Sequence, residues 1–279
     1  MAPRPIEASK LSVERGSGGG TTDADVVSGT RAFGFRFATG AVLQAGPDDC
    51  TRNVGRVRNR PGWIADETLA TGRVNITCVT MLEVETPHGQ ANVHLHPVDE
   101  PRAALVLGHG AAGGVTSRDL VAVTGVAREE GVTVALVEQP YRVAGRRSPA
   151  PARQLDAAWI AVVEHLVAGE LRGLPLVTGG RSLGARVACR TAEATEAVGV
   201  LCLAFPVHPP GKPEKTRLDE LDGVPVPVLV VQGDRDPFGM PPDADGREVV
   251  AIPGTHTLRS TSRIAAAVTG WMQPRLGAA

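Results

Sequence analysis

The sequence has no long apolar run and almost no net charge, and each shortage excludes a class of protein. No stretch approaches the roughly eighteen apolar residues of a membrane-spanning helix, and the first residues lack the apolar core of a secretion signal. We therefore expect no membrane contact and a location in the cytoplasm. The formal net charge at pH 7 is −1, and the 29 lysines and arginines are spread along the chain, so we expect no nucleic-acid partner.

Cysteine is scarce as well, and its spacing argues against a metal centre. The four cysteines have neither a CxxC spacing nor a histidine neighbour at a distance typical of metal ligands; they are Cys50, Cys78, Cys189 and Cys202. We interpret them as reduced thiols and expect neither a metal nor another cofactor. The sequence makes no prediction about the oligomeric state.

The first eighty residues differ from the remainder. They contain a glycine-rich run at 16–20, and no helical or strand period is sustained before about Gly72. Such a segment cannot easily offset the entropy of its ordering by burial. We therefore predict a flexible or irregular N-terminal extension over residues 1–80 and one domain over residues 81–279. Met81 directly precedes the first strongly patterned segment, which makes it an alternative start of the protein.

From residue 82 onward, short apolar runs alternate with helical patterns. Residues 82–85 and 91–95 alternate apolar with polar side chains around a Pro-His-Gly turn, which predicts an antiparallel hairpin. Further apolar runs occupy 103–107, 132–137, 174–177, 198–204, 226–231 and 249–252, and 154–167 is one of the amphipathic stretches between them. This order predicts an α/β-hydrolase fold: a mostly parallel, doubly wound sheet that follows an antiparallel hairpin.

One serine stands in a pattern typical of nucleophiles. Residues 180–184 read Gly-Arg-Ser-Leu-Gly, which fits G-x-S-x-G between an apolar strand and a helix-compatible run. In that context the serine occupies a strained turn, and a side chain at either glycine position would clash as the backbone doubles back. The pattern alone is weak in a chain with 33 glycines, but its position favours Ser182 as a nucleophile.

A loop rich in small residues follows the strand at 103–107 and reads His-Gly-Ala-Ala-Gly-Gly over residues 109–114. Hydrolases of this fold place one donor of the oxyanion hole here and the other directly after the nucleophile. We therefore expect the backbone N–H groups of Leu183 and of Ala111 or Ala112 to bind the oxyanion. The alternative, a loop that cradles phosphate, is disfavoured because G-x-G-x-x-G and a following Walker lysine are both missing.

Two further loops supply an acid and a base in the required chain order. Asp236 follows the apolar strand at 226–231, and His256 follows the strand at 249–252. The order serine, aspartate, histidine is the one that this fold uses, which predicts His256 as the base and Asp236 as the acid that orients it. Asp234 is the alternative acid, although an aspartate in such a loop more often caps it.

We expect further side chains at the border of the substrate pocket. We expect His109 to shape the oxyanion loop and, with Tyr141, Arg142 and His208, to be a possible substrate-binding residue. Tyr141, Arg142, Arg146 and Arg147 lie on the loop after 132–137 and could meet an anionic substrate. Solvated loop charges are an equally good interpretation of these arginines.

Several segments carry a family resemblance. Residues 138–147, 179–184, 205–214 and 232–239 resemble the family of testis-expressed protein 30 and subunit 3 of the animal non-specific-lethal chromatin complex. The run Pro-Pro-Gly-Lys-Pro-Glu at 209–214 is the most specific of these features. The match spans residues 82–258, with Ala112 and Ala185 where members usually carry glycine. The resemblance implies a compact fold without a large cap, similar in build to dienelactone hydrolases, and the triad Ser182, Asp236 and His256.

These observations predict a serine hydrolase that acts on an ester or thioester of a small acyl substrate through an acyl-enzyme. A serine peptidase would use the same chemistry, but the short segment between residues 207 and 223 leaves little material for a cap that selects large substrates. The alternative is a non-catalytic interaction module, because a fold does not determine a function and the animal relative acts as a scaffold.

Overall fold

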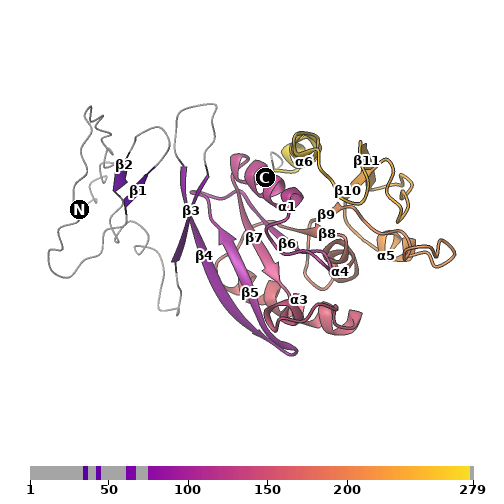
Figure 1. The fold of residues 1–279 in the computed structure, drawn as a ribbon, viewed down its shortest axis with the longest axis horizontal. Helices are drawn as coiled ribbons and strands as arrows, with labels where there is room; N and C mark the ends of the chain where they lie inside the picture. The colour runs from indigo at the N-terminus through magenta and orange to yellow at the C-terminus, as the bar shows by residue number, and fades with distance from the viewer. Residues whose placement is uncertain (1–33, 37–41, 45–60, 67–74, 277–279) are drawn as a thin grey trace. The chain divides into compact units, whose positions relative to one another are not determined.

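The computed structural model describes residues 34–36, 42–44, 61–66 and 75–276 (Figure 1). Its strands are β1 (Gly34–Arg36), β2 (Val42–Gln44), β3 (Pro61–Asp66), β4 (Asn75–Thr86), β5 (Gly89–His96), β6 (Ala103–Gly108), β7 (Val132–Glu138), β8 (Leu176–Arg181), β9 (Gly199–Leu203), β10 (Val228–Gly233) and β11 (Arg247–Ile252). Its helices are α1 (Arg118–Glu129), α2 (Pro140–Val143), α3 (Ala152–Ala168), α4 (Leu183–Thr191), α5 (Leu218–Asp222) and α6 (Thr261–Leu276).

Nine strands form one sheet in the order β11-β10-β9-β8-β6-β7-β5-β4-β3. The six strands β11, β10, β9, β8, β6 and β7 pair in parallel with their neighbours in this order, whereas β5 pairs antiparallel with both β7 and β4. The β4–β5 pair is the predicted hairpin, and each predicted apolar run forms a strand of the sheet. The predicted α/β-hydrolase fold is therefore confirmed.

Helices cover both faces of this sheet, as Figure 1 shows. Strand β6 illustrates the division, because alternate side chains of a strand point to opposite faces. Leu105 and Leu107 belong to a core cluster that includes Leu120 of α1 and Ile264 of α6. Val106, between them, belongs to a second cluster with residues of α3. Both faces of β6 are fully buried, which explains why its sequence is a continuous apolar run instead of an alternating one.

The parallel strands bring four predicted loops to one edge. Strands β6, β8, β10 and β11 all run in the same direction, so the loops that follow them leave the sheet at its carboxyl edge. These are the loops that carry residues 109–114, Ser182, Asp236 and His256. Sites in sheets of this type lie at that edge.

The sheet begins upstream of the predicted domain boundary at residue 80. Strand β4 starts at Asn75, and β3, which pairs antiparallel with it, lies wholly inside the predicted extension. The chain divides into two compact units, Met1–Arg58 and Asn59–Ala279, and the first contains the antiparallel pair β1–β2. Most of residues 1–80 lies outside the described residues, so the predicted flexible or irregular character of the extension stays a prediction.

Two remaining expectations concern cysteines and the membrane. Cys189 and Cys202 are free and buried, with their Sγ atoms 3.5 Å apart, while the side chains of Cys50 and Cys78 lie outside the described residues. In the part of the chain that the structure describes, no helix has the length and apolar character needed to cross a membrane.

Candidate active site

Ser182 stands on a strained turn between β8 and α4. Its φ of 52° and ψ of −101° are unusual for a residue with a side chain. The turn packs so closely on Gly108 that a side chain would not fit at either flanking position. A Cβ atom at Gly180 would lie 2.5 Å from the carbonyl oxygen of Gly108, and a Cβ atom at Gly184 would overlap the same oxygen. Both glycines are therefore needed for the turn to pack against β6, as the sequence pattern predicts. Strain of this kind is typical of functional positions.

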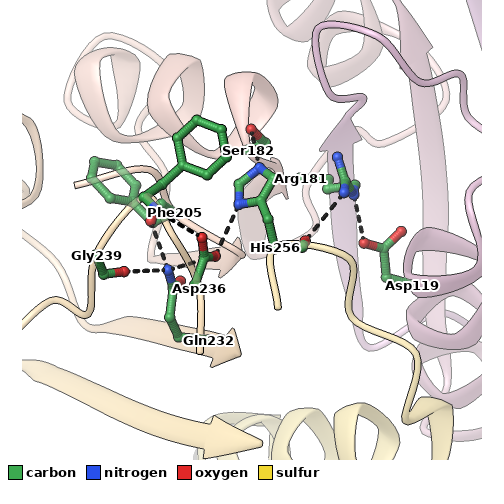
Figure 2. Close-up of polar contacts among 9 residues, drawn as sticks. Asp119, Arg181, Ser182, Phe205, Gln232, Asp236, Gly239 and His256 are labelled. Carbon is green, nitrogen blue, oxygen red and sulfur yellow. Dashed lines mark hydrogen bonds and ion pairs between the residues drawn. The ribbon is translucent and has the colours of Figure 1, made fainter. Parts of the chain in front are cut away.

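The side chains of Ser182, His256 and Asp236 form a hydrogen-bonded row (Figure 2). The Ser182 Oγ lies 2.9 Å from Nε2 of His256, and Nδ1 of His256 lies 2.9 Å from Oδ2 of Asp236. An ionised aspartate can only accept, so Nδ1–H donates to Asp236 and the lone pair of Nε2 faces the serine hydroxyl. This tautomer is the one that can take a proton from the serine.

The carboxylate of Asp236 is buried and held at both oxygens. Its side chain is 0% exposed; Oδ2 also accepts from Nε2 of Gln232 at 3.0 Å, and Oδ1 accepts from the backbone N–H of Phe238 at 2.9 Å. Gln232 also donates to backbone carbonyl groups of the same region, as Figure 2 shows. Asp234 instead accepts from the backbone N–H of Gly254 at 2.9 Å, which is the capping role considered for it.

A second group of polar contacts holds the histidine loop from the other side (Figure 2). The guanidinium group of Arg181 donates to the backbone oxygen of His256 at 3.2 Å and to Oδ2 of Asp119 at 2.8 Å. Asp119 is buried in the first turn of α1. The ring of Phe238 packs on the imidazole with its centroid 4.2 Å away. Different elements therefore fix the backbone of His256, the face of its ring and its Nδ1 atom.

The oxyanion loop is fixed by His109 and Tyr141. His109 is buried, its Nδ1–H donates to the carbonyl oxygen of Gly110 at 2.8 Å, and its Nε2 accepts from the backbone N–H of Gln139 at 3.2 Å. Burial, as the largest cause, lowers the pKa of His109, which favours this neutral form. The Tyr141 hydroxyl donates to the carbonyl oxygen of Ala111 at 3.2 Å, and burial raises the pKa of Tyr141, which keeps this donor protonated.

The contact with Tyr141 also orients the next N–H group. The C=O and N–H of a trans peptide point in opposite directions, so the bond to the Ala111 oxygen sets the direction of the Ala112 N–H. The other expected donor, the N–H of Leu183, belongs to the first residue of α4 and has no acceptor within the helix. Ala111, Ala112 and Leu183 all line the cavity that contains Ser182.

That cavity has a volume of about 470 Å³ and combines an apolar wall with basic side chains. Apart from Ser182, His256 and the oxyanion-loop residues, it is lined by Pro149, Ala150, Ala152, Leu155, Pro206, Pro210, Phe238, Arg181, Arg186, Arg190 and Arg217. No acidic side chain is among these lining residues.

The four possible substrate-binding residues lie elsewhere. His109, Tyr141, Arg142 and His208 are not among the lining residues of the cavity. His109 and Tyr141 support the oxyanion loop from behind, and Tyr141 faces a neighbouring groove with Gln139. His208 is turned to the carbonyl oxygen of Pro209, 3.0 Å from its Nδ1. None of the four therefore borders the cavity around Ser182, and a role for them in substrate binding stays a prediction.

Sequence reasoning missed the basic side chains that do line the cavity. Arg186 and Arg190 follow Ser182 by one and two turns of α4, a spacing that places them on one helix face. That helical period was a usable signal. Arg217 lies in the loop before α5, and no local pattern indicates its position. Among the described residues, no group of three or more histidine, cysteine, aspartate or glutamate side chains could hold a metal ion.

Comparisons with known proteins agree with the fold. A family model described as an alpha/beta hydrolase domain matches residues 101–260. The solved structures that match include an α/β serine hydrolase without a lid from Xanthomonas campestris, with 22% sequence identity, a TM-score of 0.59, and coverage of 72% of this chain and 96% of that chain.

Two other solved structures give similar values. Est1E from Butyrivibrio proteoclasticus has 18% identity and a TM-score of 0.57, covering 71% of this chain and 99% of that chain. A dienelactone hydrolase from Anabaena variabilis has 16% identity and a TM-score of 0.56, covering 77% and 98%. At these identities the likeness shows the fold alone, and a fold hosts many activities.

Proposed function

Because the chain belongs to the family of alpha/beta hydrolase domains, we propose that it is a serine hydrolase that cleaves an ester or thioester of a small acyl substrate. The observation that carries this proposal is the row from the Ser182 hydroxyl through His256 to Asp236, with both distances at 2.9 Å. A binding module has no physical need for these three residue types in this order.

The first half of the proposed reaction transfers the acyl group to the protein. His256 Nε2 accepts the proton of the Ser182 hydroxyl while Oγ attacks the acyl carbon. The imidazolium that forms is stabilised by the Asp236 carboxylate, which is buried and held by Gln232. Its proton then passes to the leaving alcohol or thiol, and the acyl group remains on Oγ.

The second half releases the acyl group with water. His256 takes a proton from the attacking water, and the acyl–Oγ bond breaks with return of that proton to Ser182. In both halves the carbonyl oxygen becomes negative, and the N–H groups of Leu183 and Ala112 are the donors that we assign to it. Tyr141 contributes by orienting the peptide between Ala111 and Ala112.

The cavity supports the proposed substrate class. A volume of about 470 Å³ suits a small molecule, and the apolar wall suits an acyl chain. The resemblance to testis-expressed protein 30 and the chromatin-complex subunit stays part of the proposal and rests on the sequence segments quoted for it. A cytoplasmic location and the lack of a nucleic-acid partner likewise stay predictions from the sequence.

A fluorophosphonate probe tests the proposal, because it labels activated serine nucleophiles covalently. We expect the wild-type protein to be labelled and Ser182→Ala to be unlabelled, with the same melting temperature for both. Asp234→Asn is a matched control, since Asp234 contacts Gly254 and not His256. An unlabelled but folded wild-type protein would exclude the hydrolase and favour the interaction module.

A further inference from the structure

The cavity around Ser182 is unusually basic. Four arginines line it, with no acidic side chain among the lining residues; they are Arg181, Arg186, Arg190 and Arg217. The charge of an arginine that lines a partly enclosed cavity is balanced by carboxylates of the protein, by solvent or by a ligand. The described contacts show which of the four arginines has a carboxylate partner in the protein.

Three of the arginines are compensated by carboxylates of the protein. Arg181 pairs with Asp119 at 2.8 Å. Arg186 forms a bidentate pair with Glu220, with contacts of 2.8 and 2.5 Å. Arg190 forms a second bidentate pair with Asp156 and also lies 3.3 Å from Glu220. The positive charge of each of these three arginines is therefore paired within the protein.

Arg217 is different. Within residues 75–276, no carboxylate lies at ion-pair distance from its guanidinium group, and no hydrogen bond of that group is found. Burial first and then the positive charge of Arg186 lower the pKa of Arg217. Its backbone is nevertheless well fixed, because its N–H donates to the oxygen of Val207 at 2.7 Å and its own oxygen accepts from the N–H of Glu220 at 3.1 Å.

We propose that Arg217 binds a carboxylate group of the substrate, so that the preferred ester or thioester carries a free carboxylate besides the bond that is cleaved. This inference rests on the proposed hydrolase function and specifies its substrate class. The planar guanidinium fork matches a carboxylate in a bidentate arrangement. Arg217 and Ser182 line the same cavity of about 470 Å³, a size that suits one small molecule in contact with both residues.

The charge balance favours a carboxylate over a phosphate group. Arg186 and Arg190 pair with the carboxylates of Glu220 and Asp156, and Arg217 pairs with neither of them, which leaves one positive charge without a partner. A single carboxylate neutralises that charge. A phosphate group carries up to two negative charges at neutral pH and would keep one of them unpaired in the cavity.

The test compares two matched ester series in the full-length protein. The first series consists of the mono-4-nitrophenyl esters of glutarate and adipate, which carry a free carboxylate. The second consists of the same 4-nitrophenyl esters with that carboxylate converted to a neutral methyl ester. We expect the ratio of kcat/KM, charged over neutral, to fall about ten- to a hundredfold in Arg217→Gln. Arg217→Lys keeps the charge without the fork and should give an intermediate ratio. Arg153→Gln removes an exposed charge outside the cavity and should leave the ratio unchanged.

A binding measurement separates this inference from the proposed function. Isothermal titration calorimetry with glutarate should show binding to the wild-type protein and at least tenfold weaker binding to Arg217→Gln. If both esters are inert but glutarate binding depends on Arg217, the anion site stands and the hydrolase proposal fails. If the neutral ester is cleaved and neither ratio nor glutarate binding changes in Arg217→Gln, the hydrolase stands and this inference is wrong. Tighter binding of inorganic phosphate than of glutarate would overturn the assignment to a carboxylate.

Discussion

Replacing Asp236 by asparagine tests how the carboxylate supports the histidine. The carboxylate accepts at Oδ2 from His256 and Gln232 and at Oδ1 from the backbone N–H of Phe238. In Asp236→Asn an NH2 group replaces one of the two oxygens. In either orientation of the amide, this NH2 group faces an N–H donor that now has no acceptor. At the Oδ2 position it would oppose two donors, and at the Oδ1 position only one, so we expect the second orientation.

That orientation keeps the tautomer of His256 but removes the negative charge beside it. Two unit charges about 4 Å apart interact by about 4 kcal/mol at an effective dielectric constant of about 20. Loss of this stabilisation from the transition state corresponds to a decrease in kcat of about a thousandfold. The N–H of Phe238 also loses its acceptor, which costs about 1–3 kcal/mol of folding stability.

Both quantities can be measured on one pair of proteins. Steady-state hydrolysis of 4-nitrophenyl acetate at pH 8 gives kcat, and urea unfolding gives the free energy of unfolding. The control is Asp234→Asn, whose side chain is 48% exposed and does not contact His256, so we expect a kcat within about threefold of the wild type. A decrease of less than tenfold in Asp236→Asn, or a collapse of activity in Asp234→Asn, would refute this assignment of the acid.

Three further perturbations probe the surroundings of the site. Tyr141→Phe removes the donor to Ala111, so kcat should fall about tenfold with little change in KM; an unchanged kcat contradicts the orienting role. Gly184→Ala should lower the melting temperature by about 5 °C because its Cβ meets the Gly108 oxygen, whereas Gly113→Ala, with open space around it, should not. Burial and the charge of Arg128 lower the pKa of His96 to about 4. As the pH falls below about 6.5, His96 therefore binds a proton in the unfolded chain but not yet in the folded chain. The free energy of unfolding should therefore decrease between pH 6.5 and 4 by at most about 3 kcal/mol. Solvent screening of this partly exposed side chain makes the decrease smaller. In His96→Asn, the free energy of unfolding measured with urea should depend less on pH over this range.

The strands were predictable where burial imposes a pattern. Strand β6 is buried on both faces and reads as a continuous apolar run, so its type and place followed from the sequence. Strand β3 was missed because it begins with Pro61 and Gly62, which normally argue against a strand. It stands at the end of the strand order and pairs only with β4, a position that tolerates proline.

The candidate site divides in the same way. The positions of Ser182, Asp236 and His256 after β8, β10 and β11 follow from the element order, because parallel strands end at one edge of the sheet. Their supporting contacts do not follow, since the pair Asp119–Arg181 and the bond from Tyr141 to Ala111 join segments far apart in the chain. Side-chain directions in such loops depend on tertiary packing, which a local pattern does not contain.

The functional proposal depends most directly on an acyl group attached to Ser182. Rapid mixing with an activated ester or thioester, acid quenching and mass spectrometry of the digested protein would detect that intermediate. We predict one acyl group per chain on the peptide that contains Ser182, and none in Ser182→Ala. A wild-type protein that cleaves the ester without any adduct on this peptide, or with the adduct on another residue, would contradict the account.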